Sequence, residues 1–305
     1  MLCDRKMKKD LLTILDLRKE EIMALIDRGL TIKREGRYVA RSLMGYTLGL
    51  LFDKASTRTR ISFETAMFRL GGQTIFLNRE DTQMSRDETI RDTARVLSRY
   101  LDVLTIRTYS QELVEQMAKW AEIPVINALT DFNHPCQVLS DIMTIKEKRG
   151  DLDHLKIAWI GDGNNVAHSW INAAHILGFE MILACPPNYH PLPEVLENAG
   201  QNIRVMEDPE EAARGADVIN TDVWASMGQE DEKSRRISDF KGFQVNQSLV
   251  RLGKPDVLVM HCLPAHRGEE ITNDVLDGSN SIVFDQAENK LFLHQALLEK
   301  LILER

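Results

Sequence analysis

The sequence contains few cysteines, and their spacing argues against the sites that cysteines usually build. Four occur among the 305 residues, namely Cys3, Cys136, Cys185 and Cys262, and they lie far apart without a C-x-x-C pair. This pattern favours reduced thiols, as in the cytosol, over a disulfide framework or a zinc site. We therefore expect no bound metal.

Long apolar runs and an excess of positive charge are also missing. No stretch approaches the ~18 apolar residues that a membrane span requires. The charged residues 1–6 are not followed by the apolar core of a signal peptide. The formal net charge of −8 argues against non-specific binding to nucleic acid or to anionic membranes. We expect a cytoplasmic protein that binds any anionic ligand at a local site.

The chain lacks low-complexity segments and repeats of solenoid length. Its composition, 43% hydrophobic and 28% charged, is typical of globular proteins and gives no sign of disorder. At 305 residues it exceeds the usual size of a single domain, which favours two domains of about 150 residues each.

Strand-like and helix-like runs alternate in the first half of the chain. Strands are expected at 46–52, 73–77, 102–106 and 124–127, with a helix after each of the first three. Such alternation predicts a parallel sheet with helices on both faces. Closer to the start, Asp16 is expected to cap a helix that ends near Gly36.

A second alternating series begins at residue 156. Its expected strands are 156–160, 181–184, 203–206, 218–220, 257–260 and 282–284. The polar stretch 228–236 interrupts the series and is expected to be a mobile loop. The predicted fold class is therefore α/β, with two doubly wound parallel-sheet domains.

The change between the two series sets the expected domain boundaries. The first domain is expected to cover 1–135 and the second 151–285, with the helix 136–150 as the bridge between them. A final amphipathic helix, 286–305, is expected to pack back on the first domain.

The pentapeptide Ser56-Thr57-Arg58-Thr59-Arg60 lies between the first predicted strand and a predicted helix. At a helix N-terminus the first backbone N–H groups have no partner within the helix, and hydroxyls with arginine forks then make an anion site suited to phosphate. The simpler alternative is a helix cap with solvated arginines, which a lone Ser or Thr usually is. Two arginines alternating with three hydroxyls exceed what a cap needs.

Ligands of open parallel sheets bind at the carboxyl ends of the strands. In the first half those ends also carry Arg107-Thr108 and His134-Pro135-Cys136-Gln137. Singly, Arg107 is weak evidence and a lone His134 is more often structural. Together with Gln137 they are suited to polarise a carbonyl group whose oxygen becomes negative in a transition state. We expect polar groups from both halves to face one cleft.

The segment Gly161-Asp162-Gly163 resembles the start of a dinucleotide-binding turn, but the match is poor. Val166 stands where a third small residue belongs, and no acidic residue follows the next strand. The amides of Asn164 and Asn165 suit a small zwitterion better than a pyrophosphate.

Two further strand ends leave their alternatives open. Asp222 can anchor a cationic amine, or it can cap the next segment as Asp commonly does. Cys262 can contact a nucleophilic amine, or it can be inert packing. Its protonation would be set by neighbouring charges that the sequence does not place.

Assembled, these residues resemble the aspartate/ornithine carbamoyltransferase family over nearly the full length. The shared marks are the pentapeptide 56–60, Arg107-Thr108, the segment 134–137 and residues 81–95. Asn165, Asp222, the segment 226–228 and His261-Cys262-Leu263-Pro264 are similar to the branch that acts on ornithine. The resemblance implies transfer of the carbamoyl group of carbamoyl phosphate to the δ-amine of L-ornithine, without a cofactor, as a step of arginine metabolism.

The resemblance also implies a role for each matching residue. Arg107, His134 and Cys262 would be catalytic. Carbamoyl phosphate would be bound by Ser56, Thr57, Arg58, Thr59, Gln83, Arg107, His134, Gln137, Cys262, Leu263 and Lys290. Ornithine would be bound by Asn165, Asp222, Ser226 and Met227. Gln83 would reach the site of a neighbouring subunit in a homotrimer.

One position departs from the family pattern, because Lys290 stands where arginine normally follows Gln286-Ala287-Glu288-Asn289. Lysine keeps the charge but loses the bidentate fork, so we expect weaker binding of carbamoyl phosphate rather than an inactive site. Three alternatives stay open. They are transfer to another amine such as putrescine, a nicotinamide-dependent dehydrogenase suggested by Gly161-x-Gly163, and a non-catalytic relative.

Overall fold

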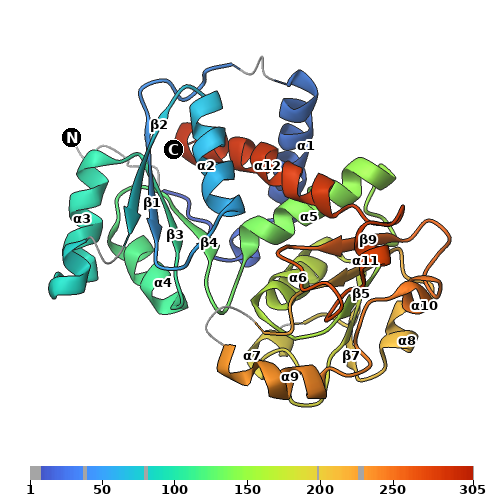
Figure 1. Cartoon of the computed structure of the whole chain (residues 1–305). Coiled ribbons are helices and arrows are strands. Elements are labelled where there is room, and N and C mark those ends of the chain that lie inside the picture. The colour runs from blue at the N-terminus through green and yellow to red at the C-terminus, as the bar shows by residue number, and fades with distance from the viewer. Residues whose placement is uncertain (1–7, 37–39, 79–81, 198, 226–229, 305) are drawn as a thin grey trace. The chain divides into compact units, whose positions relative to one another are not determined.

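The computed structural model describes residues 8–36, 40–78, 82–197, 199–225 and 230–304 (Figure 1). The chain forms two compact units. Unit 1 consists of Met1–Met143 and Glu288–Arg305, and unit 2 consists of Thr144–Ala287. None of the described helices combines the length and the apolar character that crossing a bilayer would require.

Unit 1 is built on a four-stranded parallel sheet with the order β2-β1-β3-β4. The strands are β1 (Thr47–Phe52), β2 (Gln73–Asn78), β3 (Val103–Arg107) and β4 (Val125–Leu129). All six residues of β1 are buried, which explains why its sequence after Thr47 is a continuous run without polar residues rather than an alternating one. The predicted parallel sheet of the first half is confirmed.

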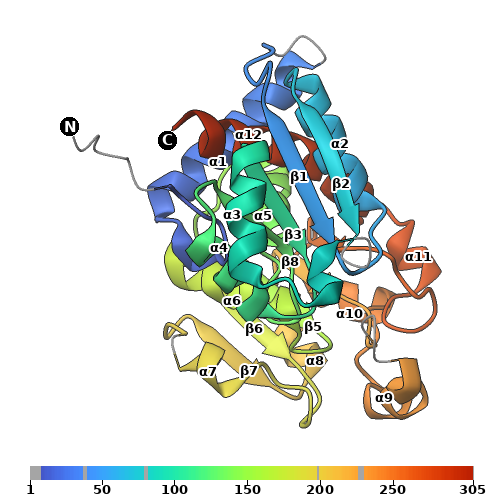
Figure 2. The same cartoon turned by 90° about the vertical axis from the view of Figure 1, so that its left-hand side faces the viewer.

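Helices cover both faces of this sheet. On one face α3 (Ile90–Tyr100) and α4 (Gln111–Trp120) pack through a cluster that includes Leu104, Val114 and Met117. The other side of the sheet carries α2 (Arg58–Arg69), as the two views agree (Figures 1 and 2). Thr89 and Ser110 cap α3 and α4 by accepting backbone N–H groups in the first turn.

The first long helix of unit 1 begins later than the sequence predicts. Thr13 caps the 3-10 helix η1 (Ile14–Asp16), and α1 (Lys19–Glu35) starts only after Arg18. Asp16 therefore does not cap α1; it completes the capping box of η1 instead. Its Oδ2 accepts the backbone N–H groups of Leu12 at 2.6 Å and Thr13 at 2.8 Å. Gly36 ends α1 as expected, at a φ of 68° that favours glycine.

The helix α12 (Val283–Leu303) replaces the strand predicted at 282–284. Ser281 forms an isolated bridge to Val259, and the Ile282 N–H donates to the Val259 carbonyl oxygen at 3.0 Å. A run of three apolar residues does not distinguish a strand from a buried helix, and here the helix continues for 21 residues. From Glu288 onward α12 belongs to unit 1, where Leu293 and Leu297 are fully buried and Glu299 pairs with Arg28 at 2.7 Å.

The helix α5 (Pro135–Arg149) begins one residue before the predicted bridge 136–150 and ends one residue before its predicted end. The division of the chain falls inside this helix, after Met143. Unit 1 also contains the short 3-10 helix η3 (Gln83–Arg86) before α3.

Unit 2 is built on a five-stranded parallel sheet with the order β7-β6-β5-β8-β9. The strands are β5 (Lys156–Ile160), β6 (Glu180–Ala184), β7 (Ile203–Met206), β8 (Val218–Thr221) and β9 (Leu258–His261). The order changes direction at β5, so the connections after β5 and β8 leave the sheet side by side. The predicted α/β fold with two parallel sheets is confirmed.

The long helix of unit 2 is α6 (Asn165–Leu177), which is buried along most of its length. The short helices are α7 (Pro193–Leu196), α8 (Pro209–Ala213), η4 (Glu230–Glu232), α9 (Lys233–Asp239), α10 (Gln247–Val250) and α11 (Asn273–Leu276). The mobile loop expected at 228–236 is wrong for its described part, because residues 230–236 are helical and Arg236 is buried. Residues 228 and 229 lie outside the described residues.

The turn after β5 explains its two glycines without a nucleotide. Gly161 has a φ of 133°, and a Cβ built on Gly163 would lie 2.3 Å from the backbone nitrogen of Pro191. Gly163 also donates its N–H to the Tyr189 carbonyl oxygen at 2.8 Å. The chain of 189–191 therefore passes directly over this turn, and only glycine fits.

We expect Gly163→Ala to lower the free energy of unfolding by about 1–3 kcal/mol, because the new methyl group meets backbone rather than a movable side chain. Urea denaturation of the purified variant measures the loss. A variant as stable as the unchanged protein would contradict this close approach.

Candidate active site

The pentapeptide of unit 1 forms the N-terminal turn of α2, directly after β1. Thr57 is the N-cap residue, and within the described turn its side chain makes no capping hydrogen bond. Thr57 is exposed and Ser56 is partly exposed, whereas Thr59 is buried. The hydroxyl of Thr57 is therefore not used to cap the helix, and the cap-only alternative does not hold for this residue.

The two arginines of the pentapeptide have different environments. Arg60 pairs with Glu64 at 2.9 Å, and its guanidinium lies 3.6 Å from the centre of the Phe76 ring. This arginine packs on β2, as cation–π contacts commonly do. Arg58 is the first residue of α2 and is partly exposed. Of the two charges, that of Arg58 lies at the helix N-terminus.

Two buried residues, Arg107 and His134, follow neighbouring strands of the same sheet. Arg107 is the last residue of β3 and is 6% exposed, and His134 precedes α5 and is 5% exposed. Hydrogen bonds fix the end of β3 beside the end of β1. The Arg107 carbonyl oxygen accepts the Asp53 N–H at 2.8 Å, and Asp53 Oδ2 accepts the Thr108 hydroxyl at 2.6 Å.

Lys290 of α12 joins this group through two hydrogen bonds. Its Nζ donates to Gln137 Oε1 at 2.8 Å and to Thr59 Oγ1 at 3.4 Å, and the lysine is 3% exposed. Gln137 in turn donates its Nε2 to Asp141 at 2.7 Å. Because Thr59 lies in the first turn of α2 and Gln137 in that of α5, Lys290 links the two helix starts to α12.

His294 lies one helical turn after Lys290 and is fully buried. Its ring stacks on Phe63 with 3.6 Å between ring centres and 11° between planes. Its Nδ1 lies 3.0 Å from the hydroxyl of Ser62, which donates to the Thr59 carbonyl oxygen at 3.0 Å. Through Ser62 and Phe63, His294 therefore stabilises the first turn of α2 on its buried side.

Burial and neighbouring cations keep both histidines neutral. Desolvation lowers the pKa of His134 well below 6.5, and the positive charges of Lys290 and Arg107 lower it further. Burial likewise lowers the pKa of His294, again with help from Lys290. A neutral imidazole carries one N–H donor, so His134 can donate to an oxygen without adding charge. Burial raises the pKa of Cys136 to about 12, which leaves this thiol unreactive.

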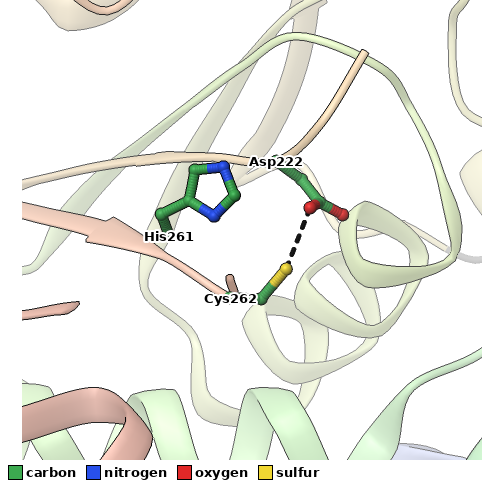
Figure 3. Close-up of side chains that lie close together, drawn as sticks. All are labelled: Asp222, His261 and Cys262. Atoms are coloured by element: carbon green, nitrogen blue, oxygen red, sulfur yellow. Dashed lines mark hydrogen bonds between the residues drawn. The ribbon is translucent and has the colours of Figure 1, made fainter. Parts of the chain in front are cut away.

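In unit 2 the carboxylate of Asp222 gathers two side chains at the end of β8. It accepts Asn164 Nδ2 at 2.8 Å through Oδ2 and the Cys262 thiol at 2.9 Å through Oδ1 (Figure 3). Oδ1 also accepts the N–H of Val223 at 2.8 Å. Asn164 caps α6 with its own side-chain oxygen, so the start of α6 fixes the carboxylate. Asp222 is 6% exposed.

The residue before Cys262, His261, has both ring nitrogens engaged. Nδ1 accepts the backbone N–H of Leu263 at 2.8 Å, so the proton lies on Nε2, which donates to Glu270 Oε1 at 3.0 Å. Asp222, His261 and Cys262 offer possible metal-ligand atoms within 4.8 Å of one another. With both nitrogens of His261 in hydrogen bonds, this arrangement is that of a hydrogen-bonded site.

A buried ion pair fixes α9 beside the glycine turn of unit 2. Arg236 donates to Asp162 Oδ2 and to the Trp224 carbonyl oxygen, each at 2.8 Å. Its guanidinium lies 4.8 Å from the centre of the Tyr189 ring. Burial raises the pKa of Asp162 to about 6, against the opposing effect of Arg236.

The structure brings several of the predicted residues together, each within its own unit. Unit 1 groups Thr59, Gln137 and Lys290 directly, and the charges of Lys290 and Arg107 lower the pKa of His134. Unit 2 joins Asp222 to Cys262. Gln83 is exposed on η3, and Asn165 is the first residue of α6. Ser226 and Met227 lie outside the described residues.

Sequence reasoning misses His294 and Glu270 and assigns Asn164 a different role. His294 is spaced four residues from Lys290 on one helix, which is a signal that both share a face. Asn164 is expected to bind a zwitterion, whereas its position before α6 is typical of a cap. Glu270 gave no signal, because an acidic residue in a polar stretch is usually exposed.

Comparisons with known proteins show the family of the chain. Residues 9–147 match the carbamoyl-P binding domain of aspartate/ornithine carbamoyltransferases, and residues 153–301 match the Asp/Orn binding domain. The chain belongs to the aspartate/ornithine carbamoyltransferase family.

Two similar sequences and one similar solved structure are each named ornithine carbamoyltransferase. The ornithine carbamoyltransferase of Desulfotalea psychrophila is 53% identical over 293 residues, which cover 94% of this chain and 97% of the relative. That of Methanoculleus marisnigri is 50% identical and covers 97% of both chains. The solved structure of ornithine carbamoyltransferase from Pyrococcus furiosus is 49% identical, covers 97% of both chains and has a TM-score of 0.93.

The buried neutral histidines make stability depend on pH. In the unfolded chain both titrate near 6.5, and in the folded chain their pKa values are lower. Below pH 6.5 the unfolded state therefore binds more protons, so the free energy of unfolding falls as the pH decreases. At about pH 5.5 we expect a loss of up to about 1.4 kcal/mol for each histidine.

Urea denaturation at neutral and at mildly acid pH tests this expectation. His294→Asn should lose less stability on acidification than the unchanged protein, because one of the two proton-linked groups is gone. Equal losses in both proteins would contradict a lowered pKa for His294.

Proposed function

We propose that the protein transfers the carbamoyl group of carbamoyl phosphate to the δ-amine of L-ornithine, forming L-citrulline and phosphate. The observation that carries this proposal is at the start of α2, where the Thr57 hydroxyl makes no capping hydrogen bond and Lys290 donates to Thr59, while Lys290 and Arg107 help to keep His134 neutral. Relatives about half identical over nearly the whole chain are named ornithine carbamoyltransferase, which supports the choice of acceptor.

Unit 1 would bind the donor in this proposal. The backbone N–H groups at the start of α2, with Ser56, Thr57, Arg58 and Thr59, suit the phosphate group. Arg107 and His134 suit the carbonyl oxygen, with Gln137 and Lys290 beside them. As the amine attacks, negative charge grows on that oxygen and on the leaving phosphate. Preformed donors that need no reorganisation stabilise both charges.

Unit 2 would bind the acceptor. Asp222 is a fixed carboxylate suited to the α-amino group of ornithine, with Asn165, Ser226 and Met227 as the other ornithine-binding residues. Cys262 and Leu263 would lie near the reacting groups, with the Cys262 sulfur positioning the δ-amine. The δ-amine must be neutral to attack, and its proton leaves with the departing phosphate or to solvent.

The first domain in this proposal covers residues 1–135 and 286–305, the second covers 151–285, and the helix 136–150 is the bridge. We further expect a cytoplasmic location and a role in arginine biosynthesis. The expected assembly is a homotrimer in which Gln83 reaches the active site of a neighbouring subunit. The exposure of Gln83 on η3 is compatible with a contact outside its own unit. Size measurement by light scattering tests the trimer.

A colorimetric citrulline assay with carbamoyl phosphate and ornithine tests the reaction. Arg58→Ala should lower kcat/KM by about 100-fold or more, since the phosphate loses a charged donor. Putrescine in place of ornithine is the acceptor control. No citrulline from the unchanged protein, or faster turnover of putrescine, would overturn the assignment.

The same assay tests the lysine at position 290. Lys290→Arg should lower the KM for carbamoyl phosphate by up to about tenfold, because the fork can contact Gln137, Thr59 and the substrate together. The KM for ornithine should not move with it. An unchanged or higher KM for carbamoyl phosphate would show that lysine is already suited to this site.

The rate should rise with pH into the alkaline range. A free amine of the ornithine type has a pKa near that of lysine, about 10.4, so the neutral fraction grows about tenfold per pH unit below that value. His134 does not offset this rise, because its pKa lies well below 6.5 and it is neutral throughout. A flat rate from mildly acid to alkaline pH would contradict the attack of a free amine.

A further inference from the structure

The connection that carries Cys262 has an unusual backbone. Leu263 has a φ of 56°, in the left-handed region that a branched side chain rarely adopts. Such a conformation persists only where surrounding contacts determine it. Around Leu263 these contacts are hydrogen bonds.

A ring of hydrogen bonds closes over this connection. The Leu263 N–H donates to His261 Nδ1 at 2.8 Å, and His261 Nε2 donates to Glu270 Oε1 at 3.0 Å. The same carboxylate oxygen accepts the backbone N–H of His266 at 2.6 Å. Glu270 thus holds residues on both sides of the segment 262–265.

Burial makes this ring selective for one arrangement. The side chains of His261 and Glu270 are both 0% exposed, so water does not replace a lost partner. Because the Glu270 carboxylate accepts the hydrogen bond from Nε2–H, the imidazole carries its proton on Nε2. The lone pair of Nδ1 then accepts the N–H of Leu263. With the other tautomer, Nδ1–H and the Leu263 N–H would be two donors facing each other.

The backbone of Glu270 is fixed independently of its carboxylate. The Glu270 carbonyl oxygen accepts the Val245 N–H at 2.8 Å, and Val245 accepts the Thr272 N–H at 3.1 Å. The next residue, Ile271, is fully buried in the core cluster of unit 2. Removal of the carboxylate therefore leaves the main chain anchored on both sides.

We propose that Glu270 is a positioning residue that sets the tautomer of His261 and thereby the turn that presents the Cys262 thiol to Asp222. It acts through His261 and touches no substrate. The ring also explains why the neighbouring carboxylate differs. Glu269 is 28% exposed at its side chain and pairs with Lys233 at 2.8 Å, so it lies outside the ring.

The consequence for Cys262 is measurable without catalysis. The thiol now donates to the carboxylate of Asp222, which disfavours the thiolate, the form that reacts with alkylating reagents. If the turn relaxes, the sulfur leaves Asp222 and reacts faster. Cys136 and Cys185 are buried, and peptide mass spectrometry reads the modification of Cys262 separately.

The first experiment compares iodoacetamide labelling of Cys262 in folded Glu270→Ala, Glu270→Gln and the control Glu269→Ala. We expect Glu270→Ala to label about fivefold faster or more, because the buried His261 Nε2–H and the partly buried His266 N–H lose their acceptor. Glu270→Gln keeps an accepting oxygen and should stay within about twofold of the unchanged protein, as should Glu269→Ala. Equal labelling in all four folded proteins would overturn the proposal.

The second experiment uses His261 and holds even if Glu270→Ala fails to fold. His261→Asn places an oxygen near the position of Nδ1 and keeps an acceptor for the Leu263 N–H, whereas His261→Gln reaches toward Glu270 and loses that acceptor. We expect slow labelling in His261→Asn and fast labelling in His261→Gln. The reverse order would overturn the proposed route through Nδ1.

Kinetics link this inference to the proposed function, on which its catalytic consequence rests. In Glu270→Ala, kcat/KM for ornithine should fall about tenfold or more, while the KM for carbamoyl phosphate changes less than about twofold. Rescue by Glu270→Gln is expected. If the unchanged protein makes no citrulline, the proposed function fails and the labelling order still decides the role of Glu270. If it makes citrulline and Glu270→Ala is equally active, the positioning role fails alone.

Discussion

Both units depend on one physical constraint, the burial of charged side chains near the carboxyl ends of their parallel strands. In unit 1 two buried cations, Arg107 and Lys290, are packed with histidines that burial keeps neutral. In unit 2 the buried groups Asp222 and Glu270 are acidic. Burial of unpaired charge is unfavourable, so these groups are held by hydrogen bonds, and Arg107, Lys290 and Asp222 suit ligands of the opposite sign.

The signs of Arg107, Lys290 and Asp222 match the chemistry of the proposed substrates. A phosphorylated donor is anionic, and an amino acid with a second amine is attracted to carboxylates. Because the chain as a whole is acidic, with a formal net charge of −8, selectivity for the donor must come from these few buried cations rather than from the general field. The neutral His134 adds a hydrogen-bond donor there without further repulsion.

Much of the fold follows from short-range patterns in the sequence. The strands β1, β5 and β7 and the helix α4 fall where runs of apolar or periodic residues predict them. The rule that strand ends carry the ligand groups led to Arg107, Asp222 and Cys262 without coordinates. Spacing and side-chain chemistry were sufficient because these residues follow their strands directly.

Some predictions from the sequence are wrong or incomplete, because the interactions responsible are not visible in a local sequence pattern. The run 282–284 is apolar because it begins a buried helix, and a strand would look the same over three residues. Arg60 shares a motif with Arg58, yet Phe76 of the neighbouring strand takes up its guanidinium. Glu270 and His294 act through partners nine and more than two hundred residues away, so only the folded chain reveals them.

The division of unit 1 between the two ends of the chain governs how the protein is made. Lys290 and His294 lie on α12, whereas Thr59, Ser62 and Gln137 belong to the first half of the chain. A ribosome releases residues in order, so the β1–β4 sheet emerges long before the helix that completes its polar group. Unit 2, a continuous segment, has all of its own residues available first. The cationic group of unit 1 is therefore assembled last, and a chain cut short before α12 never acquires it.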